Sequence, residues 1–160
     1  MGRSGEKWHL VVESGRSFMF MGAYSHTIDA KGRLIIPAKF REGLGERFVV
    51  SKGFDGCLQA YDPESWKDIE AKLKELPQFR KEARDIARFF LGGAVEAEID
   101  KQGRILIPAT LRQYAGLEKD VTLVGSGSKV EIWDSAKWNK AEPESIEDLA
   151  ENLSALGFSL

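Results

Sequence analysis

The chain has 160 residues, 42% of them hydrophobic and 30% charged, a composition typical of a folded globular protein and not of a disordered one. Its formal net charge of −2 provides no general attraction to polyanions, so a nucleic-acid site would have to be a local basic surface. The single cysteine, Cys57, excludes an internal disulfide, and no apolar run approaches the roughly eighteen residues of a membrane helix, so we expect a cytoplasmic protein without membrane contact.

The first predicted elements are two short strands joined by a tight turn. Apolar residues favour strands over 23–28 and 34–36, and the sequence DAKGR lies between them. Asp29 can accept hydrogen bonds from backbone N–H groups two or three residues on, and Gly32 permits the positive φ of a sharp reversal. Arg33 then lies four residues from the carboxylate. Its guanidinium can close on Asp29 or point outward to a phosphate, and the pattern leaves both open.

The next segments predict a short helix, a hairpin and two connector helices. Pro37 fits the first turn of a helix over 38–45, because its missing N–H has no helical partner to lose there. The stretch FVVSKGFDGCLQAY, residues 48–61, predicts a hairpin that turns at Asp-Gly. Apolar residues at helical spacing then indicate amphipathic helices over 62–76 and 78–91.

The turn and its flanks return 71 residues later. IDAKGRLIIPAKFR, residues 28–41, and IDKQGRILIPATLR, residues 99–112, are identical at eight of fourteen positions. The same succession of strand, DxxxR turn, strand, helix and hairpin follows in the second copy, and IEDLAENLSALGF, residues 146–158, predicts a final amphipathic helix. Because one copy is too small to bury a convincing core, we expect the two to pack about a pseudo-twofold axis. The predicted fold class is α+β, mainly β with short helices.

Both turns are locally basic. Residues 28–42 carry four basic side chains against two acidic ones, and residues 99–113 carry three against one. Short basic loops repeated on a symmetric scaffold match the spaced phosphates of duplex DNA, so we expect direct contacts from Arg33 and Arg104. Further positive charge at the same end would come from Lys31, Lys101, Arg41 and Arg112. The other interpretation is that each aspartate–arginine pair only staples its hairpin.

Catalytic and ligand-binding patterns are weak. His26 and Asp29 would lie on opposite faces of a strand, and no third metal ligand accompanies them. The sequence GSGS at 125–128 lacks the flanking pattern of a phosphate-binding loop and indicates a hairpin turn. Trp66 and Trp138 occupy equivalent positions of the two copies, which favours packing over base stacking. We therefore expect no enzyme activity, no metal or other cofactor and no small-molecule substrate.

The sequence resembles the MraZ family of bacterial transcriptional regulators, which have a duplicated SpoVT-AbrB domain. The resemblance rests on MFMGAYSHTIDAKGRLIIPAKFREGLGERFVVSKG, on the second DKQGRILIP, and on the proline that follows each DxxxR turn. It implies two AbrB-like swapped-hairpin halves that form a pseudo-dimeric barrel. It also implies a homo-oligomeric ring of eight or more subunits that binds direct repeats of double-stranded DNA in the promoter of its own division and cell wall gene cluster, as a repressor.

The resemblance also implies residue roles. Lys31, Arg33, Lys101 and Arg104 would face DNA, and Asp29 and Asp100 would shape the loops together with the turn glycines, Gly32 and Gly103. It implies a cytoplasmic protein associated with the nucleoid.

Two other non-enzymatic functions share this fold class. AbrB-like domains also occur in antitoxins that bind a toxin partner, and a structural ring protein would need no DNA. The domain organisation we expect is an extension over 1–18, a first repeat with connector helices over 19–91, and a second repeat with a C-terminal helix over 92–160. Family members commonly begin near MFMG, so we interpret the extension as a start codon assigned too far upstream.

Overall fold

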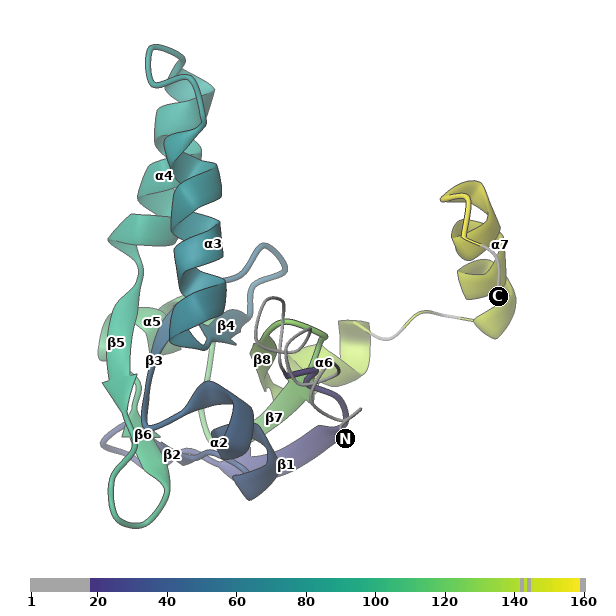
Figure 1. The fold of residues 1–160 in the computed structure, drawn as a ribbon. Helices are drawn as coiled ribbons and strands as arrows, with labels where there is room; N and C mark the ends of the chain where they lie inside the picture. Colours follow the sequence, from purple (N-terminus) through teal and green to yellow (C-terminus); the bar gives the residue numbers. More distant parts are fainter. Residues whose placement is uncertain (1–17, 142, 144, 159–160) are drawn as a thin grey trace, which may run out of the picture.

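The computed structural model describes residues 18–141, 143 and 145–158 (Figure 1). The expected extension over 1–18 lies outside the described residues, apart from Phe18. The described strands are β1 (Ala23–Thr27), β2 (Arg33–Ile35), β3 (Arg47–Lys52), β4 (Leu58–Tyr61), β5 (Val95–Glu98), β6 (Arg104–Leu106), β7 (Asp120–Gly125) and β8 (Val130–Asp134). The described helices are α2 (Ala38–Leu44), α3 (Pro63–Lys74), α4 (Lys81–Gly92), α5 (Ala109–Ala115), α6 (Ser135–Ala141) and α7 (Ile146–Ala155). The predicted α+β class is therefore confirmed.

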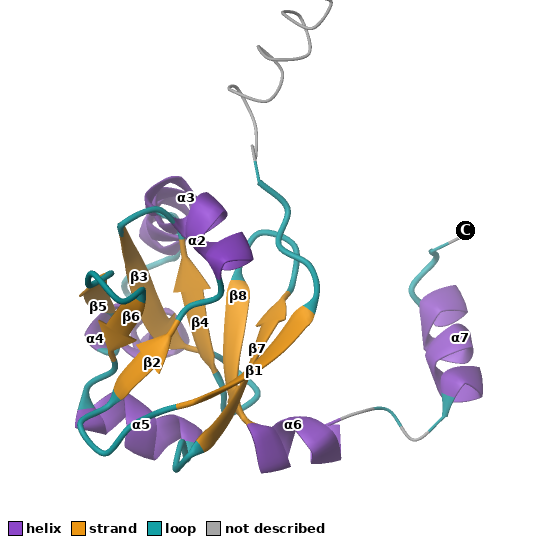
Figure 2. Cartoon of the chain, turned by 90° about the horizontal axis from the view of Figure 1, so that it is seen from below, coloured by secondary structure: helices purple, strands orange, loops and turns teal. Residues whose placement is uncertain are grey.

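The two copies exchange strands. The larger sheet has the order β1-β7-β8-β4-β3-β5, so the first strand of each copy pairs with the hairpin of the other copy. A separate antiparallel ribbon joins β2 to β6, again one strand from each copy (Figure 2). This is the swapped arrangement that the resemblance implied. Neither half can complete its sheet without strands from the other.

The expected barrel is open. Strands β1 and β5 are the edges of the larger sheet, and β2 and β6 form a separate two-stranded sheet. The physical reason is that β2 pairs with β6 of the other copy and does not continue a ladder with β1. One isolated bridge, Ile28 with Leu34, joins the β1 side to the ribbon. The ribbon therefore forms a layer of its own.

A pseudo-twofold axis passes through the centre of the ribbon. Leu34 lies opposite Ile105, its own equivalent 71 residues later, and both side chains are buried. The axis also passes between β4 and β8 of the larger sheet, where Gln59 of the first copy lies opposite Glu131 of the second. The predicted symmetry between the copies is thus visible in strand register as well as in sequence.

One core is shared by both copies. It includes Ile36, Phe40 and Phe48 from the first copy and Ile107, Leu111 and Leu123 from the second, all with 1% or less of their surface exposed. The inner face of the ribbon closes this core through Leu34 and Ile105. Cys57 is buried as well, and burial raises the pKa of its thiol to about 12, as befits a packing residue.

The helices connect and flank the two copies. The Asp62 side chain accepts a hydrogen bond from the Ser65 N–H and caps α3, as predicted. Helix α4 begins at Lys81, later than expected, because the turn after Pro77 closes through the Arg80 N–H. Together α3 and α4 project away from the sheets (Figure 1). Trp66 packs against Tyr61, with ring centroids 5.6 Å apart, which agrees with a packing role.

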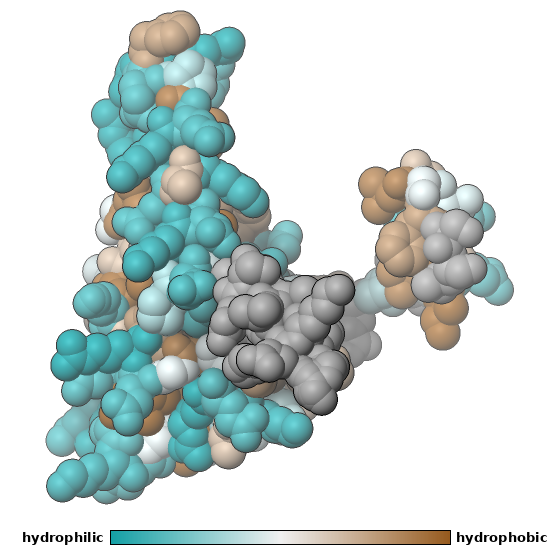
Figure 3. Space-filling view, viewed as in Figure 1, coloured by the Kyte–Doolittle hydropathy of each residue, from teal (hydrophilic) through white to brown (hydrophobic). Residues whose placement is uncertain are grey.

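Helix α7 stands apart from the rest of the described chain (Figures 1 and 2). Its capping residue is Ser145, whose Oγ accepts a hydrogen bond from the Asp148 N–H at 3.0 Å. The side chains of Ile146, Leu149 and Leu156 are exposed, and apolar atoms are visible on its surface in Figure 3. The predicted C-terminal helix is confirmed, but its apolar face is not packed against the part of the chain that the structure describes.

Candidate nucleic-acid interface

The first DxxxR turn is organised around one carboxylate. Asp29 Oδ1 accepts hydrogen bonds from the backbone N–H groups of Lys31 at 3.0 Å and Arg33 at 2.9 Å. Its Oδ2 accepts from Arg33 Nε at 2.7 Å. Gly32 has a φ of 92°, which a side chain would strain. The turn is thus fixed by its own sequence.

The second turn repeats this geometry. Asp100 Oδ1 accepts from the N–H groups of Gln102 and Arg104, both at 2.9 Å, and its Oδ2 accepts from Arg104 Nε at 2.9 Å. Gly103 has a φ of 79°. In both copies the arginine therefore closes on its aspartate through Nε. This contact does not use the two Nη groups, which carry most of the donors, although Arg104 Nη2 also donates to Gln102 Oε1 at 3.3 Å.

The outer face of the β2–β6 ribbon, which we call the ribbon face, consists of Arg33, Ile35, Arg104 and Leu106. Neighbouring residues of a strand point to opposite sides, so the burial of Leu34 and Ile105 places these four on the other side. Arg33 lies opposite Leu106, and Ile35 lies opposite Arg104. The ribbon face thus carries two arginines and two apolar side chains, related by the pseudo-twofold axis.

The apolar members of the ribbon face were missed by the sequence analysis. Ile35 is 41% exposed and Leu106 is 59% exposed, unusually high for large aliphatic residues in short strands. The sequence predicts apolar strands at 34–36 and 105–107, and this prediction does not distinguish their two faces. Strict alternation around Leu34 and Ile105 was the signal that could have identified them.

The two DxxxR loops lie at one end of the molecule, opposite the tip of the α3–α4 hairpin (Figure 1). Lys31 and Lys101 are exposed on these loops, beside the half-buried Arg33 and Arg104. The structure therefore brings four of the predicted basic residues together along and beside the ribbon face.

Arg41 and Arg112 occupy a different environment. They are half-buried on α2 and α5, and each guanidinium lies against the DxxxR loop of the other copy. Arg112 Nη1 donates to the carbonyls of Ile107 and Lys31. These two arginines were expected to add charge for DNA, and the structure places them beneath the loops.

The loop aspartates are more acidic than ordinary carboxyl groups. The pKa of Asp29 lies below the usual 3.8, first because its carboxylate accepts the Arg33 backbone N–H and then because it accepts Arg33 Nε–H. The pKa of Asp100 is lowered by the same contacts with Arg104. Since the folded-state pKa is depressed, this stabilisation is present above the unfolded value and is lost as the pH falls through the lowered pKa.

We therefore expect both carboxyl groups to titrate with midpoints below 3.8 in the folded protein. Carboxyl-carbon NMR would measure this, and the amide resonances of Arg33 and Arg104 should move with the same midpoints because they donate to these carboxylates. Asp29→Asn should abolish the transition at the first loop and leave that of Asp100 in place. Midpoints at or above 3.8 would contradict the geometry.

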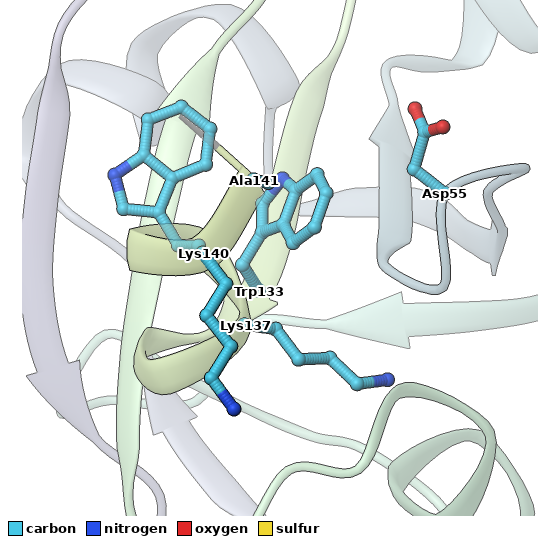
Figure 4. Close-up of a pocket in the computed structure, with 6 residues that line it drawn as sticks. Asp55, Trp133, Lys137, Lys140 and Ala141 are labelled. Carbon is cyan, nitrogen blue, oxygen red and sulfur yellow. The ribbon is translucent and has the colours of Figure 1, made fainter. Parts of the chain in front are cut away.

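One hollow of the described chain lies away from the ribbon face, beside α6. It has a volume of about 590 Å³ and is lined by Asp55, Trp133, Lys137, Trp138, Lys140 and Ala141. Figure 4 shows the Lys140 amine directed away from the Trp133 indole. Over the described residues, no cluster of three or more histidine, cysteine or acidic side chains forms a metal site. Nor does any described helix have the length and apolarity to cross a membrane.

Sequence comparison relates the chain to proteins already named. Two segments, residues 19–89 and 90–156, match the family described as "MraZ protein, putative antitoxin-like". A protein of Thermoanaerobacter sp. strain X514 is 60% identical over 143 residues, which cover 88% of this chain and 100% of the relative. A protein of Acetivibrio thermocellus is 56% identical over the same shares of the two chains.

A third relative, from Lachnoclostridium phytofermentans, is 52% identical over 141 residues, 88% of this chain and 99% of its own length. All three relatives bear the name "Transcriptional regulator MraZ". With two consecutive family matches and identities above one half over nearly the whole of each relative, this chain belongs to the MraZ family.

Proposed function

We propose that this chain is a sequence-specific, DNA-binding transcriptional regulator and not an enzyme. The observation that carries the proposal is the ribbon face, where Arg33 and Arg104 lie symmetrically between two exposed loops that carry Lys31 and Lys101. The names of the relatives support the regulatory role. We also propose that the two family matches correspond to two working repeats, over 19–91 and 92–160.

The β2–β6 ribbon is two-stranded, and the major groove of B-form DNA admits a two-stranded β-ribbon. Each Arg–Asp contact uses Nε and so holds the guanidinium in place, while its Nη groups could bind a guanine edge or a phosphate. In the second copy this would replace the contact of Arg104 Nη2 with Gln102 Oε1 at 3.3 Å. Ile35 and Leu106 would lie against thymine methyl groups. The flanking lysines would contact phosphates, which position the protein without reading the sequence.

We further propose that the regulator acts as a homo-oligomeric ring of eight or more subunits, bound to direct repeats in the promoter of its own division and cell wall gene cluster. One ribbon face offers few contacts, and linked identical sites raise the overall affinity by roughly 10² or more through effective concentration. Binding of this kind at a promoter would repress the cluster and place the protein at the nucleoid, within the cytoplasm.

One observation favours a second function, that of an antitoxin. The exposed apolar face of α7 suits a protein partner, and the family description includes the words "antitoxin-like". A toxin gene beside this gene would support that function. The duplicated ribbon face is not explained by it, nor by a purely structural ring.

The direct test is binding of the full chain to the DNA immediately upstream of its own gene. We expect a gel shift with this DNA at concentrations that do not shift a shuffled sequence of equal length, together with a solution mass of eight or more subunits. Equal binding to the shuffled DNA would refute sequence specificity. A monomeric mass would refute the ring and leave DNA binding to be judged separately.

A further inference from the structure

We propose that Arg41 and Arg112 are positioning residues that brace the DxxxR loops, each from the helix of one copy onto the loop of the other. Only the expected effect on DNA affinity rests on the proposed function, because the braced loops flank the proposed DNA-binding surface. The bracing itself is a property of the protein without DNA. Both arginines are thereby assigned a role other than direct contact with phosphates.

The contact of Arg112 is made by hydrogen bonds. Its Nη1 donates to the Ile107 carbonyl, at the end of the ribbon, and to the Lys31 carbonyl in the first loop at 3.4 Å. The guanidinium also fills the space above Gly32, where an added Cβ would lie 1.9 Å from Nη1 and 2.9 Å from Cζ. One planar group therefore touches both the loop and the ribbon.

Arg41 lies against the second loop from the equivalent position on α2, and the contact is one of close packing over Gly103. A Cβ added to Gly103 would lie 1.7 Å from Arg41 Nη1 and 3.0 Å from its Cζ, and the three nearest atoms all belong to this arginine. Gly103 is buried although it belongs to a turn at the end of the molecule. The second occurrence shows that the arrangement follows from the repeat and does not depend on one rotamer.

The glycine of each turn therefore meets two requirements. It supplies a positive φ, and it leaves room for an arginine from the other copy. Gly45 separates these requirements, because its φ is 84° but the nearest atom to an added Cβ is 4.0 Å away. Replacement of Gly45 tests backbone strain alone, whereas replacement of Gly103 adds displacement of Arg41.

The chemistry of bracing demands arginine and not merely a positive charge. A guanidinium offers several donors in a rigid plane, so it can bind carbonyls while it covers a glycine. A lysine amine keeps the charge but cannot form this contact in the same geometry. Holding the loops before DNA arrives reduces the ordering cost that binding would otherwise include.

The first measurement is amide hydrogen exchange of the full-length protein without DNA. Arg41→Ala should accelerate exchange of residues 102–104 about tenfold or more and leave residues 31–33 nearly unchanged, and Arg112→Ala should do the reverse. Arg47→Ala is the matched control, since its side chain is 75% exposed in an ion pair with Glu98. Unchanged exchange in the loop opposite each mutated helix overturns the proposal.

The second measurement is affinity for the upstream DNA. Arg41→Lys should weaken binding as much as Arg41→Ala, roughly tenfold, because the charge remains and the brace does not. If the Arg41→Lys protein binds the upstream DNA with an affinity within twofold of wild type, Arg41 is assigned to phosphate contact and the proposal is overturned. Gly103→Ala should weaken DNA binding when Arg41 is present, and it should weaken binding little further when it is combined with Arg41→Ala. Gly45→Ala should have little effect on affinity, whether Arg41 is present or replaced by alanine.

The two proposals fail in different ways. A wild-type protein that binds no DNA under any condition would refute the proposed function, and the exchange experiment would still decide the bracing. Normal DNA binding with loop exchange insensitive to Arg41→Ala and Arg112→Ala would refute the bracing alone.

Discussion

Arg33→Ala is expected to weaken binding to the upstream DNA at least tenfold, about 1.4 kcal/mol, because it would remove a charge-assisted contact that recurs in every subunit of the proposed ring. Arg104→Ala should act similarly, since its Nε–Asp100 contact repeats that of Arg33 with Asp29. The double variant should lose specific binding. Fluorescence anisotropy at fixed salt measures all three, with the oligomer mass recorded for each.

The matched control is Arg80→Ala. Arg80 also forms an exposed ion pair, 2.6 Å from Glu82, but it precedes α4 at the tip of the α3–α4 hairpin, far from the ribbon face (Figure 1). We expect its affinity to stay within twofold of wild type. Wild-type affinity in a correctly assembled Arg33→Ala protein would remove Arg33 from the interface.

The sequence predicts the turns well because their chemistry is local. Asp29 and Arg33 are four residues apart, and the hydrogen bonds that fix the turn involve only residues within that span. The duplication is also evident from the sequence, since eight identities between two windows of fourteen residues define the alignment of the two copies. These local and internal signals identified the fold class before any long-range contact was known.

Other features depend on contacts that no local pattern encodes. Arg112 donates a hydrogen bond to Lys31, 81 residues away in the first loop. Its place in a helix predicts only that it adds positive charge near the second turn. The separation of the ribbon from the larger sheet likewise depends on the pairing of β2 with β6 across the two copies. Because the ribbon is a separate sheet, the expected barrel is not closed. The roles of Ile35 and Leu106 became visible only once the buried face of each strand was known.

The family match and the ribbon face are independent supports for a regulator. The match concerns the whole chain, and the ribbon face concerns a few side chains whose register follows from the strand pairing. The tip of the α3–α4 hairpin and the free α7 lie away from the ribbon face (Figure 1). In the proposed ring, both elements could therefore contact neighbouring subunits without obstructing DNA at the ribbon face.

Salt should weaken DNA binding steeply. If Lys31, Arg33, Lys101 and Arg104 neutralise about four phosphates for each engaged subunit, the affinity falls with a slope of roughly −0.9 per phosphate, about a hundredfold between 50 and 200 mM salt. The measurement is the binding constant over a salt series, plotted on logarithmic axes. Lys31→Ala should make the slope shallower by about 0.9 per engaged subunit, because one released counterion is lost.

Leu106→Ala is the control that distinguishes a loss of apolar contact from a loss of charge in DNA binding. Leu106 belongs to the ribbon face and is 59% exposed, but it carries no charge. Its replacement should lower the affinity and leave the salt slope unchanged, because an apolar contact releases no counterions. A wild-type affinity that hardly changes over this salt range would mean that the basic loops do not approach the phosphates. Arg33 and Arg104 would then serve only to hold their own turns, through Asp29 and Asp100.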